Sequence, residues 1–349
     1  MSKKRTGNSK YKNMEILRRL EKQQACLFKD IKHTCDGNKK NKLTIGSHII
    51  SEKDYLSRIA SKDDKVLVFN IRHESYYEKE ERGKLEDLLA PVHISNTANT
   101  RNILCGKHDK SLFDKIENGI KLDENGANYK QQCFQFALRA FIFDYIHEKN
   151  VNDKEIKTGH SELANNRASI GLLRSEKILK KFQEAYLNSN WDCIETKVIT
   201  LDKRANFISC LSFFPMTYLK FRYSGHVSDK IYLNIFPENN QTKIVISYFV
   251  NSSKHCKRLS DIIYSLYLKK NFKKIEEFLT RCVLLYDLKV TYNIDYFNRL
   301  IHDETRKMQF IKFSLYIRKA RNFSDIYNKN FLRIFVFEKL RINLFDDYL

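Results

Sequence analysis

Three cysteines and one histidine constrain the fold of this chain more than any other feature of its sequence. Cys26 and Cys35 flank a short polar segment, and Cys105 and His108 are two residues apart where a helix is expected to begin. Three thiolates and one imidazole are a ligand set typical of a tetrahedral Zn²⁺ site, with metal–ligand bonds of about 2.0–2.3 Å. We therefore expect one structural zinc ion to join these two segments. His33 could replace either ligand of the first pair, and the alternative is that the thiols lie in separate cores.

The other cysteines have more ordinary surroundings. The N-terminus is basic but has no apolar run after it, so we expect no secretory signal and a cytoplasmic protein with reduced thiols. Four of these cysteines lie among apolar neighbours and are predicted to be small core residues; they are Cys133, Cys193, Cys210 and Cys282. Cys256 is predicted to be a loop thiol.

Length and hydropathy indicate a chain of two domains that does not span a membrane. At about 150 residues per domain, 349 residues suggest two domains. No apolar run reaches the ~18 residues that a membrane-spanning helix needs. Only 3 prolines and 10 glycines interrupt the chain. The expected organisation is a basic arm and helix at 1–24, a zinc-binding domain with a helical extension at 25–190, and a sensor or assembly domain at 191–349.

The apolar patterns predict an α+β protein: an N-terminal zinc module with helices, followed by an antiparallel sheet with C-terminal helices. The segment 133–149 has an almost wholly apolar body, which is typical of a core helix. The remaining expected helices are 51–60, one that opens after residue 105, 172–188, 259–269, 271–287 and 293–320. The expected strands are 43–50, 65–72, 197–201, 207–214, 230–236 and 243–250, and 73–91 is expected to be a loop.

The charge of the chain favours a polyanionic partner. A formal charge of +21 would attract phosphates, which supply most of the sequence-independent affinity for nucleic acids. Arg139 lies in the middle of the apolar helix, where either an ion pair or a phosphate contact would explain it. The residues predicted to contact DNA or RNA are Lys3, Lys4, Arg5, Lys107 and Arg139.

One third of the chain resembles a known family. HNH endonucleases commonly have a zinc-binding cysteine pair, then a DHI-like strand, then an N-LLC-x-x-CH-x-K-like segment. This chain has SHI at 47–49 and NILCGKHDK at 102–110, within a match over 24–118. It is also similar to a bacterial group, associated with phage-defence neighbourhoods, that has the pattern C…C…AHSI…FC-x-x-HD-x-x-LF-x-x-IE. The residues that fit this pattern after the first cysteines are Cys105, His108, Asp109, Leu112, Phe113, Ile116 and Glu117.

The resemblance implies a treble-clef-like zinc fold and a metal-dependent nuclease, with a defence role as one expectation. His48 falls on the general base, and Asn102 on the asparagine that orients it, although Asn99 or Asn96 could serve instead. Asp109 falls where the family has the final histidine that binds a catalytic Mg²⁺ or Mn²⁺. Glu117 could share that cation, or it could form an ion pair with Lys121 on the helix surface.

A second function class stays open beside the nuclease. Ser47 replaces the family's aspartate before the base, and Asp109 replaces its last histidine. If these two residues do not complete a cation site near His48, the chain is a non-catalytic, zinc-stabilised protein that binds nucleic acid or assembles with partners. In either case the C-terminal half is expected to bind a protein partner or a second copy of the chain, and no membrane partner is expected.

Overall fold

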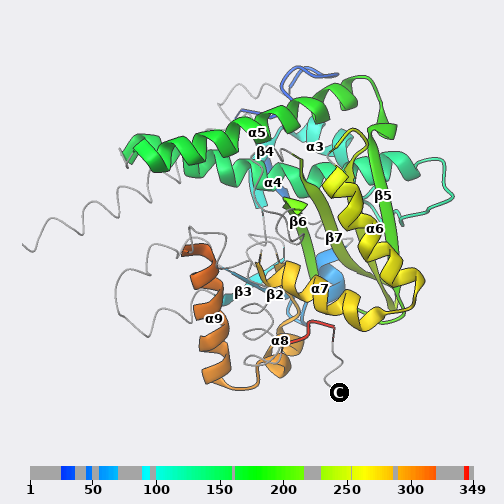
Figure 1. Ribbon diagram of the computed structural model, residues 1–349, viewed down its shortest axis with the longest axis vertical. Helices are drawn as coiled ribbons and strands as arrows, with labels where there is room; N and C mark the ends of the chain where they lie inside the picture. Colours follow the sequence, from blue (N-terminus) through cyan, green and yellow to red (C-terminus); the bar gives the residue numbers. More distant parts are fainter. Residues whose placement is uncertain are drawn as a thin grey trace, which may run out of the picture. The chain divides into compact units, whose positions relative to one another are not determined.

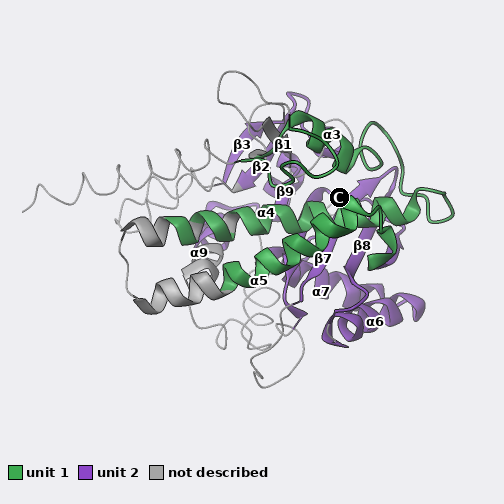
Figure 2. Cartoon of the chain, turned by 90° about the horizontal axis from the view of Figure 1, so that it is seen from above, with its two compact units in different colours: residues 1–49, 100–194 green, residues 50–99, 195–349 purple. Residues whose placement is uncertain are grey.

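The computed structural model describes residues 25–35, 45–48, 55–69, 89–94, 100–158, 162–215, 229–252, 254–285, 290–319 and 342–345. The chain forms two compact units (Figure 2). Unit 1 consists of residues 1–49 and 100–194, and unit 2 of residues 50–99 and 195–349.

Unit 1 contains a small antiparallel pair of strands that leads into a helix. Strand β1 (Ile45–His48) pairs with β4 (Thr100–Leu104), and His48 lies opposite Thr100. Helix α3 (Gly106–Phe113) begins directly after β4, with Cys105 as its extended N-cap residue. The order in space is therefore strand, strand, helix.

Two long helices make up most of the rest of unit 1. Helices α4 (Tyr129–Thr158) and α5 (Glu162–Leu187) lie along one another (Figure 2), and a short 3₁₀ turn, η5 (Trp191–Cys193), follows them. Every residue of α4 from 132 to 146 is buried, as its apolar sequence predicts. Phe134 and Phe141 of α4 both pack on Phe182 of α5, with ring centroids 5.6 and 5.2 Å apart.

Unit 2 is built on a seven-stranded sheet with the strand order β3-β2-β9-β6-β7-β8-β5. The strands are β2 (Lys65–Phe69), β3 (Leu89–His93), β5 (Ile194–Leu201), β6 (Phe207–Phe213), β7 (Ile231–Glu238), β8 (Gln241–Phe249) and β9 (Val290–Tyr292). The neighbouring pairs from β3 to β8 are antiparallel. The hairpin between β7 and β8 turns through Asn239, whose positive φ of 56° suits an asparagine.

The helices of unit 2 complete its core. They are α2 (Ser57–Ile59), α6 (Lys254–Leu268), α7 (Phe272–Leu285), α8 (Ile294–Leu300) and α9 (Glu304–Lys319). One continuous apolar cluster joins alternate residues of the strands, such as Leu211, Leu233 and Ile246, to Leu259 of α6 and Leu279 of α7. In Figure 1, α6 and α7 (yellow) lie over this sheet.

The structure confirms the α+β class, with an antiparallel sheet and helices. Residues 50–99 were expected in the N-terminal domain, but they belong to unit 2 because β2 pairs with β9. The expected helix 293–320 is divided into α8 and α9, and the expected loop 73–91 ends in β3. Cys133, Cys210 and Cys282 are buried as predicted, whereas Cys256 is a buried residue of α6 rather than a loop thiol. No helix within the described ranges is long and apolar enough to cross a membrane.

Candidate metal centre

The first part of the candidate site is a compact series of turns at residues 26–35. The backbone N–H of Lys29 donates to the carbonyl of Cys26, and that of Ile31 to the carbonyl of Phe28, over 3.1 and 3.0 Å. Asp30 and Lys32 have positive φ angles of 59° and 60°, so the chain turns back sharply here. These turns bring Cys26 and Cys35 to the same place.

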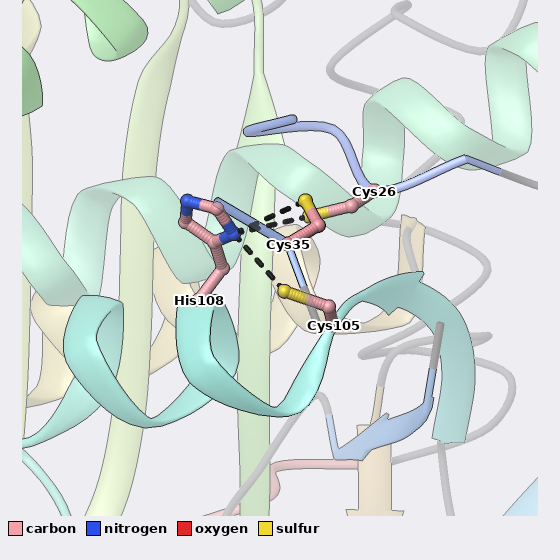
Figure 3. Close-up of side chains that lie close together, drawn as sticks. All are labelled: Cys26, Cys35, Cys105 and His108. Carbon is pink, nitrogen blue, oxygen red and sulfur yellow. Dashed lines mark hydrogen bonds between the residues drawn. The ribbon is translucent and has the colours of Figure 1, made fainter. Parts of the chain in front are cut away.

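The second part comes from β4 and α3. The N–H of Leu27 donates to the carbonyl of Ile103 in β4 over 3.1 Å, which fixes the turn segment beside the start of the helix. Cys105 precedes α3 and His108 lies in its first turn, so both point to one side. Figure 3 shows the thiols of Cys26 and Cys35 pointing toward the same ring of His108.

The three thiols converge on one ring nitrogen of His108. The Nδ1 atom of His108 lies 3.0 Å from the Sγ atom of Cys105, 3.5 Å from that of Cys26 and 3.7 Å from that of Cys35. The four ligand atoms all lie within 4.8 Å of one another. In a tetrahedron with Zn–S bonds of about 2.3 Å and a Zn–N bond of about 2.0 Å, sulfur and nitrogen would be about 3.5 Å apart. The observed spacing fits a single ion between them.

The other nitrogen of His108 determines which tautomer is present. Its Nε2 atom lies 2.8 Å from the carbonyl oxygen of Ile31. A carbonyl only accepts hydrogen bonds, so Nε2 carries the proton and Nδ1 of the neutral ring has a free lone pair. Metal-bound histidines usually donate their second N–H to a carbonyl or carboxylate in this way. One lone pair can accept only one thiol proton, so three thiols around it are better explained as metal ligands than as a hydrogen-bonded cluster.

Burial distinguishes the members of the cluster. Cys26, Cys105 and His108 are at most 5% exposed, whereas Cys35 is half-buried. Burial raises the pKa of the Cys26 thiol to about 12, although the backbone amides of Cys105 and Phe28 act to lower it. Without a cation a buried thiolate is therefore disfavoured, and a bound metal ion would reverse this preference by its own charge.

Residues of α5 support the cluster from outside. The side-chain amide of Gln183 donates to the carbonyl of Leu27 over 2.6 Å. The ring of Phe28 is fully buried and packs edge-on against Tyr186, whose hydroxyl lies 2.7 Å from that of Ser111 in α3. These contacts place α5 against both the turn segment and α3, the two parts that provide the candidate ligands.

His33 does not belong to the group of metal-ligating atoms. It is exposed, and its Nε2 atom lies 3.4 Å from the hydroxyl oxygen of Tyr186. The choice that the sequence left open between His33 and the other candidates is therefore made in favour of Cys26, Cys35, Cys105 and His108.

The strands next to this cluster carry the predicted catalytic base. His48 lies opposite Thr100, and Gly46 lies opposite Asn102. Positions 48 and 102 are therefore diagonal neighbours, offset by two residues along the paired strands, and they belong to the same face of the pair. The structure describes the backbone at these positions and not the side chains. The predicted roles of His48 and Asn102 stay predictions.

The two predicted acids differ in their surroundings. Asp109 lies in the first turn of α3, half-buried, with its N–H donating to the carbonyl of Cys105 over 2.9 Å. Glu117 forms an ion pair with Arg139, not with Lys121. Arg139 is 3% exposed, and the Cζ atom of its guanidinium lies 4.2 Å from the centre of the Phe113 ring. Arg139 and Glu117 are thus engaged with each other. Their predicted contacts with nucleic acid and with a cation stay predictions.

The predicted nucleic-acid contacts lie partly outside the described residues, since Lys3, Lys4 and Arg5 are in segment 1–24. Lys107 is an exposed residue of α3.

Sequence reasoning did not identify the supporting residues of the site. The carbonyl of Ile31 belongs to the backbone and has no residue-type signal. Gln183 and Tyr186 are three residues apart on α5, and that spacing indicated only a buried helix face.

None of the known protein families, curated proteins or solved structures compared with the chain matches it. The likeness to HNH endonucleases therefore rests on the quoted residues alone.

Proposed function

We propose that the chain is a zinc-stabilised, HNH-like nuclease that hydrolyses phosphodiester bonds of DNA or RNA. The observation that carries this proposal is the start of helix α3, where the N-cap residue Cys105 and His108 of the first turn follow the strand β4 that is paired to β1. A zinc-ligating helix after two antiparallel strands is the order that the resemblance requires. The net charge of +21 suits a phosphate substrate.

The structural metal in this proposal is zinc, held by Cys26, Cys35, Cys105 and Nδ1 of His108. All four positions around the ion would be taken by protein ligands, which is typical of structural rather than catalytic zinc sites. The ion would hold residues 26–35 against β4 and α3 and so fix the strand pair next to which catalysis would occur.

In the proposed chemistry, His48 accepts the proton of the attacking water and Asn102 orients its imidazole. Asp109 would hold a Mg²⁺-class cation together with phosphate oxygens. When bound, such a cation would stabilise the negative charge that develops on the phosphate and on the leaving oxygen. A role in phage defence rests on the resemblance alone.

A second candidate is a non-catalytic, zinc-stabilised protein that binds nucleic acid. The ion pair of Glu117 with Arg139 favours it, because that pair engages a carboxylate that could otherwise bind the catalytic cation. The presence of Ser47 in place of the family's aspartate also favours the second candidate.

A cleavage assay separates the two candidates. Wild type and His48→Ala are incubated with plasmid DNA and with single-stranded RNA, with and without Mg²⁺ or Mn²⁺. The nuclease proposal predicts divalent-dependent cleavage that falls by about 10²–10⁴-fold in His48→Ala, since one proton-transfer group is lost. His302→Ala, an exposed histidine of unit 2, is the matched control. Zinc content and melting temperature are measured on the same preparations, and both should stay at wild-type values.

Cleavage that survives in folded, zinc-loaded His48→Ala would rule out this mechanism. Zinc-loaded wild type that binds but never cleaves either nucleic acid would favour the second candidate.

A further inference from the structure

The turn between α6 and α7 presents four lysines around two apolar side chains. We call residues 268–274 the α6–α7 tip. Leu268 is 66% exposed and Phe272 is 39% exposed. The four lysines are all exposed, and they are Lys269, Lys270, Lys273 and Lys274.

The lysines of the tip outnumber the acidic residues near them. The sequence has no Asp or Glu from residue 262 to residue 275, and of the two that follow, Glu276 pairs with Lys203. Glu277 lies about one helical turn after Lys273 in α7. Among the residues that the structure describes, the ion pairs do not include any lysine of the tip. The nearest acidic residue on α6, Asp261, lies 3.8 Å from Lys197 of β5 instead.

Backbone hydrogen bonds define the conformation of the tip. The N–H of Asn271 donates to the carbonyl of Leu266, and that of Lys270 to the carbonyl of Tyr267, each over 2.9 Å. Lys270 has a φ of 54°, a helix-terminating position that glycine usually occupies. The side chain of Asn271 accepts from the N–H of Lys274 at 3.4 Å, as a helix N-cap does. The lysines therefore lie on a turn whose backbone conformation is defined by hydrogen bonds.

Aromatic rings lead up to the tip from α6. Tyr264 and Tyr267 have ring centroids 5.8 Å apart, and Tyr267 and Phe272 are 6.3 Å apart. Phe272 is the exposed end of this row. A ring supported on one side and open on the other can accept a further flat group.

We propose that the α6–α7 tip binds single-stranded nucleic acid, with the lysines on phosphates and a base stacked on Phe272. Proteins that bind single strands without sequence preference combine these two elements. The bases of a duplex have both faces covered, so stacking on an exposed ring selects unpaired strands. The proposal shares its partner class with the proposed function, but it does not need a catalytic site.

Charge and apolar area together favour this partner over an anionic membrane. Lysines beside apolar groups also occur on membrane-binding helices. Here Leu268 is the only strongly exposed apolar side chain of the tip, because Phe272 is partly covered. Even a myristoyl chain, which is far larger than one leucine, gives only marginal membrane binding alone.

Binding of the full-length protein to a labelled single-stranded oligonucleotide tests the four lysines. The assay is done at several salt concentrations, without added divalent cations, so that cleavage plays no part. Replacing all four lysines with glutamine should weaken binding and reduce the slope of log K against log salt by up to about 3, since each phosphate contact contributes about 0.7. The control replaces four exposed lysines elsewhere, namely Lys62, Lys65, Lys177 and Lys180. An equal loss in the control would overturn the proposal, because net charge would then explain the binding.

Phe272 distinguishes a nucleic acid from a membrane. Phe272→Ala should weaken single-strand binding by about fivefold or more, Phe272→Tyr should keep it, and Phe272→Leu should not restore it, because only a ring can stack on a base. Leu268→Ala should change it little. Full binding by Phe272→Leu, or binding to phosphatidylserine vesicles that exceeds binding to the oligonucleotide, would contradict the proposal. Unchanged melting temperatures exclude misfolding as the cause. If the protein binds single strands normally but has no nuclease activity, the nuclease proposal is rejected and the single-strand-binding proposal is supported.

Discussion

Cys105 is the residue on which the metal centre depends most directly. Its Sγ atom lies 3.0 Å from Nδ1 of His108, and its side chain is 1% exposed. A structural zinc site has an apparent binding free energy of about 10–16 kcal/mol, comparable to or larger than the stability of a typical domain. Cys105→Ala should therefore lose zinc and unfold residues 25–35 and 100–113.

Cys193 is the matched control for this substitution. It is a half-buried cysteine of unit 1 that is not in the cluster, and burial raises its pKa to about 11. Cys193→Ala should keep its zinc and lose at most about 1.5 kcal/mol of stability. Elemental analysis and thermal melting measure both variants. A folded, zinc-loaded Cys105→Ala protein would contradict the assignment.

Glu117 gives a second prediction at the same scale. Arg139 is buried and its guanidinium is paired with this carboxylate, so removing the acid would leave an uncompensated buried charge. Glu117→Gln should lower the free energy of unfolding by about 3 kcal/mol. The double variant with Arg139→Met should recover much of that loss. Urea unfolding measures both, and a stable Glu117→Gln protein that has lost only nuclease activity would favour a catalytic role for this acid instead.

These residues show what the sequence could and could not reveal about the site. The four ligand candidates were identifiable because polar, turn-like surroundings distinguish them from the buried cysteines of strands and helices. The partner of Arg139 was not, because Glu117 lies 22 positions before it and the chain between them can fold back in many ways. The backbone acceptor at Ile31 has no signal in any sequence.

Among the helices and strands, the α6–α7 hairpin gives a prediction about stability. Lys270 adopts a left-handed conformation that costs an L-residue about 1–2 kcal/mol, whereas glycine adopts it freely but loses about 0.4–1 kcal/mol more entropy on folding. Lys270→Gly should therefore stabilise unit 2 by about 0.5–1 kcal/mol, while single-strand binding becomes weaker. Urea unfolding and the binding assay are compared on the same protein. A less stable variant would show that the side chain of Lys270 supports the fold.

Long periodic elements were predictable and short ones were not. The helix at 133–149 and the strands at 207–214, 230–236 and 243–250 have enough residues for their period to show, and the structure contains α4, β6, β7 and β8 there. Strand β9 has three residues, too few to show a period, and it lies between β2 and β6. Its pairing with β2 joins residues 65–69 to the sheet of unit 2, and no pattern in the sequence indicated that pairing.

For the whole chain, the two units should respond differently to loss of metal. The candidate ligands all lie in unit 1, whereas unit 2 has an apolar core of its own. A zinc chelator should abolish hydrogen-exchange protection in β4 and α3, while β6, β7 and β8 should keep theirs. The reason is that the free energy of zinc binding stabilises only the unit that provides the ligands. Loss of protection in both units together would show that unit 2 does not fold independently of the metal.

Zinc K-edge X-ray absorption of the full chain, purified without added metal, tests the central claim most directly. We predict about one zinc per chain, with three sulfur neighbours at about 2.3 Å and one nitrogen neighbour at about 2.0 Å. In His108→Ala, either another atom should take the place of the nitrogen neighbour of zinc or the zinc should be lost. A folded wild type without zinc, or zinc surrounded by oxygen and nitrogen atoms instead of sulfur, would contradict the account.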